Sequence, residues 1–183
     1  MKRKDLPFRI MMISSIVVSS CFVISLEIIS DARQVSGQFT TPLVPQNTQN
    51  MQQSVNSTTL KVFTDSLRGL VSKSTELTGK YQLELGKWAT KENDNLTMIS
   101  ITDNYLPQFE DLVNEASNLA VPYGQENIKD SFIKSISSEL SSYEHFKNYL
   151  ITGNTTENEI SNNEFSLAFQ YEQVYATFLL KNR

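Results

Sequence analysis

An apolar heptad repeat that begins at Leu60 restricts the possible folds of this chain more than any other feature. Apolar residues, with one serine, recur there at alternating intervals of three and four: Leu60, Phe63, Leu67, Leu70, Ser74, Leu77 and Tyr81. Leu85 and Trp88 continue the series after a shift of one position. This spacing puts one apolar stripe along a helix, and such a stripe needs another helix to cover it.

Three further stretches have helical periodicity. The second has an expected face of Ile99, Leu106, Phe109, Val113, Ala116 and Ala120, flanked by Met98, Tyr105, Leu112 and Leu119. The third uses Ile128, Phe132, Ile133, Ile136, Leu140, Tyr143, Phe146, Tyr149 and Leu150. The fourth uses Ile160, Leu167, Ala168, Tyr171, Val174, Tyr175 and Phe178. We expect Pro107 to kink or split the second helix, and a capping box at Thr156 to open the fourth.

No stretch alternates with period two, so no strands are predicted. The predicted fold is all-α: an antiparallel up-down four-helix bundle formed by residues 59–183, following an N-terminal membrane segment and a flexible linker. The rival arrangement is a pair of long hairpins that closes only by dimerising. The chain is long enough for a monomeric bundle, which we therefore prefer.

The N-terminus predicts the location of the chain. Residues 1–9 hold four Lys or Arg against one Asp, and residues 10–29 are apolar with a single acid. Cations before an apolar run keep the N-terminus in the cytoplasm. We therefore expect a basic cytoplasmic tail (1–9), a transmembrane signal anchor (10–29) and an extracytoplasmic C-terminal domain in a single-pass protein of the cell membrane.

Two alternatives for this segment remain open. It fits a signal peptide cleaved near Ala32, which would leave a secreted protein. It also contains a loose lipid-attachment box that ends at Cys21. Residues 30–58 are rich in Gln and poor in charge, so they are predicted to form a disordered polar linker.

Charge is distributed unevenly between the first two helices. Residues 59–91 hold six Lys or Arg and three Asp or Glu, whereas residues 92–128 hold seven Asp or Glu and no Lys or Arg. Lys73, Lys80 and Lys87 are expected to face Asp103 and Glu110 across the helix pair. The acidic helix is interpreted either as a solvated, partly neutralised face or as a surface that binds cations or a partner.

Several function classes lack their sequence signals. A net charge of −4 argues against nucleic-acid binding. One His and one Cys cannot supply the ligands of a zinc or Glu-x-x-His di-iron site. No nucleotide or hydrolase motif occurs. We therefore expect no catalytic site, metal or cofactor, and classify the chain as a non-enzyme.

Two sets of residues remain as candidate sites. Aromatic residues on inward phases are a candidate ligand pocket, or else ordinary core: Tyr81, Trp88, Tyr105, Tyr143, Tyr171 and Tyr175. Three Asn-x-Ser/Thr sequons are candidate glycosylation sites, although chance alone yields about three in this composition: Asn56, Asn95 and Asn154.

Three segments carry a resemblance. The sequences at 77–81 (Leu-Thr-Gly-Lys-Tyr), 104–109 (Asn-Tyr-Leu-Pro-Gln-Phe) and 145–150 (His-Phe-Lys-Asn-Tyr-Leu) resemble small, uncharacterised envelope proteins of ammonia-oxidising archaea, over roughly residues 60–180. The resemblance implies an archaeal envelope setting and no functional residues. The architecture is also similar to four-helix extracytoplasmic sensor domains.

Two functional hypotheses follow. The first is an anchored, non-catalytic module that docks an envelope or membrane protein through one face of the bundle. The second is an extracytoplasmic domain that binds a small ligand, or senses it, in an aromatic pocket.

Overall fold

The computed structural model describes the backbone of residues 47–183 and the side chains of residues 59–183. Residues 56–183 form one compact unit. The predicted basic tail, the predicted membrane segment 10–29 and residues 30–46 of the predicted linker lie outside the described residues. Within the described part every regular element is a helix, and there are four. None of these helices is long and apolar enough to cross a bilayer.

The first helix, α2 (Asn47–Ala89), begins twelve residues earlier than the predicted domain boundary at residue 59. Residues 47–58, assigned to the linker from their polarity, contain no Pro or Gly. Their Gln and Met are good helix formers, so polarity alone did not exclude a helix there. The heptad prediction for α2 is confirmed, since every seam position from Phe63 to Trp88 is buried.

Helix α3 (Asn95–Ser117) begins where predicted, because the Asp94 side chain caps it by accepting a hydrogen bond from the Thr97 amide at 2.8 Å. The helix continues through Pro107, so the expected split does not occur. Pro107 is exposed, and water can satisfy the carbonyl that loses its helical partner.

The buried face of α3 differs from the predicted one by about one position. Met98, Thr102, Phe109, Leu112 and Ala116 are buried, whereas the predicted Ile99, Leu106 and Val113 are half-buried and Ala120 is exposed. The reason is that a polar residue, Thr102, occupies a core position. The prediction considered only apolar residues, and it therefore placed the buried face about one position away from the observed one.

Helix α4 (Glu126–Thr152) ends at Gly153, as predicted, with this glycine in the left-handed conformation at φ 70°. Helix α5 (Thr155–Lys181) follows at once. Its cap is Asn154, whose side chain accepts from the Thr156 amide at 3.0 Å, and not the predicted box at Thr156.

Helices α4 and α5 pack closely through small residues. The hydroxyl of Ser135 donates to the Ala168 carbonyl at 2.9 Å, and the hydroxyls of Ser142 and Ser161 lie 3.2 Å apart. These contacts turn Ala168, Ser161 and Tyr175 toward α4. Leu167 and Val174, predicted as core, are 37% and 42% exposed instead.

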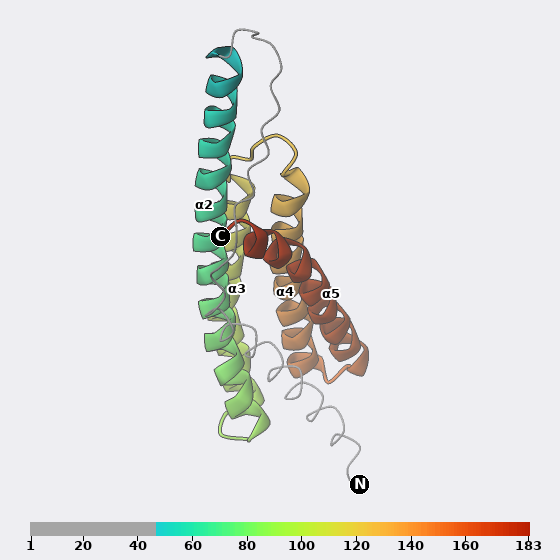
Figure 1. Ribbon diagram of the computed structural model, residues 1–183. Coiled ribbons are helices and arrows are strands. Elements are labelled where there is room, and N and C mark those ends of the chain that lie inside the picture. The colour runs from blue at the N-terminus through green and yellow to red at the C-terminus, as the bar shows by residue number, and fades with distance from the viewer. Residues whose placement is uncertain (1–46) are drawn as a thin grey trace, which may run out of the picture. The chain divides into compact units, whose positions relative to one another are not determined.

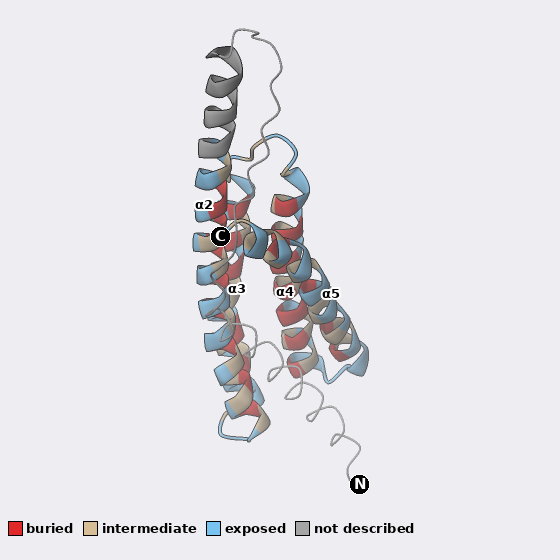
Figure 2. Cartoon of the chain, in the orientation of Figure 1, coloured by how far each residue is buried: buried red, intermediate tan, exposed pale blue. Residues whose placement is uncertain are grey.

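Consecutive helices run in opposite directions, and α5 crosses α4 obliquely (Figure 1). The C-terminal end of α5 reaches α2, where Phe178 packs on Phe63 at 5.8 Å between ring centroids and Arg68 donates to the Asn182 carbonyl at 2.6 Å. Buried residues line the sides of α2, α3 and α4 that face one another, whereas much of α5 is exposed (Figure 2).

Candidate functional site

A buried carboxyl, Glu139, is the most unusual chemical feature of the core. It lies on α4 and is 8% exposed. Its Oε1 accepts two hydrogen bonds, one at 2.7 Å from the Thr78 hydroxyl of α2 and one at 2.5 Å from the Tyr143 hydroxyl, one turn along α4. No Lys, Arg or His forms an ion pair with it within the described residues. A charge buried without a countercharge is costly, so a neutral, protonated form is favoured.

Burial raises the pKa of the Glu139 carboxyl to about 7. The hydrogen bonds from Thr78 and Tyr143 act in the opposite direction, and the negative charge of Glu172 on α5 adds to the increase. Glu172 is half-buried, and desolvation raises its own pKa as well. Burial and the nearby Glu172 charge therefore both disfavour ionisation of Glu139, which makes this layer sensitive to pH near neutrality.

Three of the predicted pocket residues converge beside this carboxyl. The ring of Tyr81 packs on Tyr143, with centroids 4.1 Å apart, and on Tyr105 at 5.3 Å. The Thr102 hydroxyl donates to the Met98 carbonyl, so it accepts its 2.9 Å hydrogen bond from the Tyr81 hydroxyl. Burial raises the pKa of Tyr81 and of Tyr143, which keeps both phenols protonated.

The other three predicted residues lie elsewhere. Trp88 packs edge-on against Phe146 at 5.1 Å, and its indole donates to the Asn95 side chain at 2.9 Å. Tyr175 packs on Phe132 at 5.1 Å. Tyr171 is half-buried on α5, with the Lys134 ammonium 5.7 Å from its ring centroid. The six predicted pocket residues therefore lie in four separate places and do not form a single lining.

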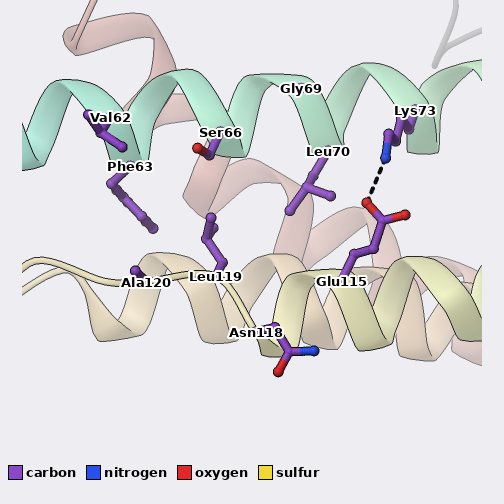
Figure 3. Close-up of a pocket in the computed structure, with 10 residues that line it drawn as sticks. All are labelled: Val62, Phe63, Ser66, Gly69, Leu70, Lys73, Glu115, Asn118, Leu119 and Ala120. Carbon is purple, nitrogen blue, oxygen red and sulfur yellow. Dashed lines mark hydrogen bonds and ion pairs between the residues drawn. The ribbon is translucent and has the colours of Figure 1, made fainter.

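An open groove lies between α2 and the end of α3, with a volume of about 560 Å³ (Figure 3). Phe63, Leu70 and Leu119 supply its apolar surface, and an ion pair between Lys73 and Glu115 at 2.6 Å bounds it. None of the six predicted pocket residues lines it. No buried polar group points into it, so it lacks the fixed polar contacts that orient a ligand.

The predicted charge pairing between α2 and α3 is only partly present. Lys73 reaches α3 through Glu115, but Lys80 and Lys87 bind Glu76 and Glu84 on their own helix. Asp103 pairs instead with Lys147 of α4. The exposed Glu110 and Asp111 form no ion pair within the described residues. No group of three or more Asp, Glu, His or Cys side chains in this part of the chain is arranged to hold a metal.

Two of the three sequons can be placed by side chain. Asn95 and Asn154 are exposed, at the first residue of α3 and at the cap of α5. In both, Oδ1 accepts a local hydrogen bond, from Trp88 and from the Thr156 amide. Glycosylation modifies Nδ2 and would leave these bonds intact. Asn56 lies within α2 and not in a loop, and its side chain is outside the described residues.

Part of the apolar face predicted for α5 lies outside the core, since Leu167 and Val174 are exposed. We call Ile160, Leu167, Tyr171, Val174 and Phe178 the α5 stripe; at about 100° per residue they fall within roughly 60° of the helix circumference. Leu167 and Val174 are exposed, and the other three are half-buried: Phe178 packs on Phe63 of α2, and the Lys134 ammonium of α4 lies over the Tyr171 ring. Four of the nine exposed large hydrophobic residues of the described chain lie on α5, two of them, Leu167 and Val174, in the stripe.

Charge is sparse along the same helix. Between residues 165 and 180 the only charged residue is Glu172, which points inward. Exposed positions beside the stripe are neutral: Asn163, Ser166, Gln170, Gln173 and Thr177. Depletion of charge around apolar residues is typical of the centre of a protein–protein interface.

A comparison of the chain with protein-family models, curated proteins and solved structures gave no match.

Proposed function

We propose that the chain is a membrane-anchored, extracytoplasmic interaction module of the cell envelope and has no catalytic activity. In this proposal residues 10–29 anchor the chain and the following polar segment is a spacer. Helices α2 to α5 then form an antiparallel up-down four-helix bundle that presents one face to a protein partner. The archaeal envelope setting belongs to the same proposal and rests on the resemblance of the three segments above.

The exposed α5 stripe is the observation that carries the proposal. Its residues keep the spacing of a helix–helix seam, yet Leu167 and Val174 remain open to water because α5 is turned toward α4 by its small residues. Burial of such side chains is worth about 1.5–3 kcal/mol each. A second helix laid along the stripe would recover this free energy, and the neutral flanks would lose no ion pair.

The ligand-pocket alternative has less support. The ring of Tyr81 packs on those of Tyr105 and Tyr143, and the hydroxyls of Tyr81 and Tyr143 already form hydrogen bonds to Thr102 and Glu139. A small molecule would have to displace these contacts before it could bind. Core packing accounts for the same residues without a ligand.

Native electrophoresis of the full chain from gently solubilised membranes tests the proposal. We expect the wild type to migrate as an assembly larger than one chain, and the double variant Leu167→Ser/Val174→Ser to migrate at lower mass. The matched control is Leu96→Ser, which removes a 75% exposed leucine from outside the stripe. Circular dichroism checks that all three proteins keep their helix content. An assembly that survives the double change would refute the proposal.

A further inference from the structure

We propose that the partner of the α5 stripe is the α5 stripe of a second copy of this chain, packed antiparallel. This inference rests on the proposed function and names the occupant of its docking surface. It starts from the arrangement of charge along α5. Acids lie near the N-terminal end, at Glu157, Glu159 and Glu164, and bases lie near the C-terminal end, at Lys181 and Arg183.

An antiparallel pair of α5 helices brings these opposite charges together. In the register that pairs Leu167 with Tyr171 of the second copy, Ile160 faces Phe178 and Glu157 faces Lys181. Each of these contacts occurs twice, as an isologous two-fold interface requires. A parallel pair would place the acidic ends side by side and the basic ends side by side, so charge complementarity selects the antiparallel orientation.

The flanks of the stripe fit the same register. Gln170 lies opposite its own copy at the two-fold axis, and Asn163 lies opposite Thr177, so neutral polar side chains meet along the edge. Glu164, at the rim of the stripe, is half-buried and lies opposite Val174, where its carboxylate can reach water. The Glu157 carboxylate already pairs with His145, with Oε2 and Nδ1 2.7 Å apart, so that pair borders the interface.

The interface is small. From Ile160 to Phe178 the stripe is about 27 Å long at 1.5 Å per residue, and one helix pair of this length buries less than the roughly 1,200 Å² of a standard interface. The association is therefore weak and depends on concentration. A shared membrane anchor would raise the effective concentration of the two copies and so favour the dimer.

Photocrosslinking in the native membrane tests the identity of the occupant. A photoreactive amino acid is introduced at Gln170 of the full chain, with Ser166 as the matched control position: it is equally exposed on α5 but lies off the stripe. We expect Gln170 to give an adduct of twice the 20.8 kDa chain mass and Ser166 to give little. Adding Leu167→Glu should lower the yield of this adduct by about tenfold or more, because the substitution places a charge at the buried centre of the interface.

The alternative outcomes separate the two proposals. If Gln170 gives an adduct of another mass, and Leu167→Glu removes that adduct, the partner is not a second copy of this chain. The proposed docking function would then stand, and the proposed homodimer would be overturned. No adduct at Gln170, or equal adducts from both positions, overturns the docking function as well.

Orientation is tested by disulfide formation between two differently tagged copies, both carrying Cys21→Ser. The antiparallel register predicts a bond between Ile160→Cys in one copy and Phe178→Cys in the other, and none between two copies of Ile160→Cys. The reverse pattern would establish a parallel pair and overturn the proposed geometry.

Discussion

Replacement of Glu139 by glutamine should stabilise the protein strongly at pH 8 and much less at pH 5. Glutamine has the shape of the protonated carboxyl and stays neutral at every pH. Its side-chain oxygen can still accept the hydrogen bonds that Thr78 and Tyr143 donate to Oε1. The difference between variant and wild type therefore isolates the ionisation of a single group.

The magnitude follows from the pKa values of the two states. The carboxyl has an ordinary pKa of 4.5 and a pKa of about 7 in the fold. The folded state therefore holds a proton that the unfolded chain releases, and its stability falls as the pH rises between these values. The contribution of Glu139 is fully present below about pH 4.5 and is lost as the pH rises through 7. At about 1.4 kcal/mol for each pH unit, the wild type loses about 3 kcal/mol relative to the variant.

Urea unfolding of the full chain in non-ionic detergent, at several pH values between 5 and 8, measures this difference. The fluorescence of Trp88, the single tryptophan, reports the transition, since this residue is 9% exposed in the fold. Glu144→Gln is the matched control: an exposed glutamate on the same helix, expected to change stability by less than about 0.5 kcal/mol. If Glu139→Gln were less stable than wild type by the same amount at every pH, the carboxyl would be ionised in the core and our reasoning refuted.

Three further substitutions test the packing of the helix ends and of the α4–α5 contact. Arg68→Ala removes the donor to the Asn182 carbonyl and should cost about 1 kcal/mol, with faster amide hydrogen exchange confined to the last turn of α5. Ala168→Leu should cost about 1–3 kcal/mol in urea unfolding, because the Ser135 hydroxyl contacts the backbone there and leaves no room for the added carbons. Asp94→Ala removes the cap of α3 and should cost about 1 kcal/mol, whereas Asp94→Asn should retain most of that stability.

The buried face of α2 was predictable because apolar residues occupy nearly every inward position of this helix. Glu139 was missed for the opposite reason. It stands in the series Phe132, Ile136, Glu139, Tyr143 and Phe146, at intervals of four and three. An apolar count passes over such a residue. The signal was present in the sequence as a single acidic residue at a core position of the helix. Its hydrogen-bond partners are two hydroxyls, of Thr78 and Tyr143, which apolar periodicity does not identify.

The orientation of α5 could not be predicted from apolar periodicity. Leu167 and Val174 outrank Ala168 and Ser161 in any hydrophobicity scale, so the larger residues were assigned to the core. Close approach of two helices depends instead on small side chains and on hydrogen bonds such as the one from Ser135 to a carbonyl of α5. Which face of α5 meets α4 is thus decided by contacts between helices, and Leu167 and Val174 are left exposed.

Cysteine accessibility along α5 in the native membrane tests whether a partner covers the α5 stripe. Single cysteines at 166, 167, 170, 173 and 174, in a Cys21→Ser background, are labelled with a membrane-impermeant maleimide before and after dispersal in a denaturing detergent. We predict that 167, 170 and 174 are protected in the membrane and become reactive on dispersal, while 166 and 173 react in both states. Equal labelling of all five positions in the membrane would show that nothing covers the stripe and would contradict the account.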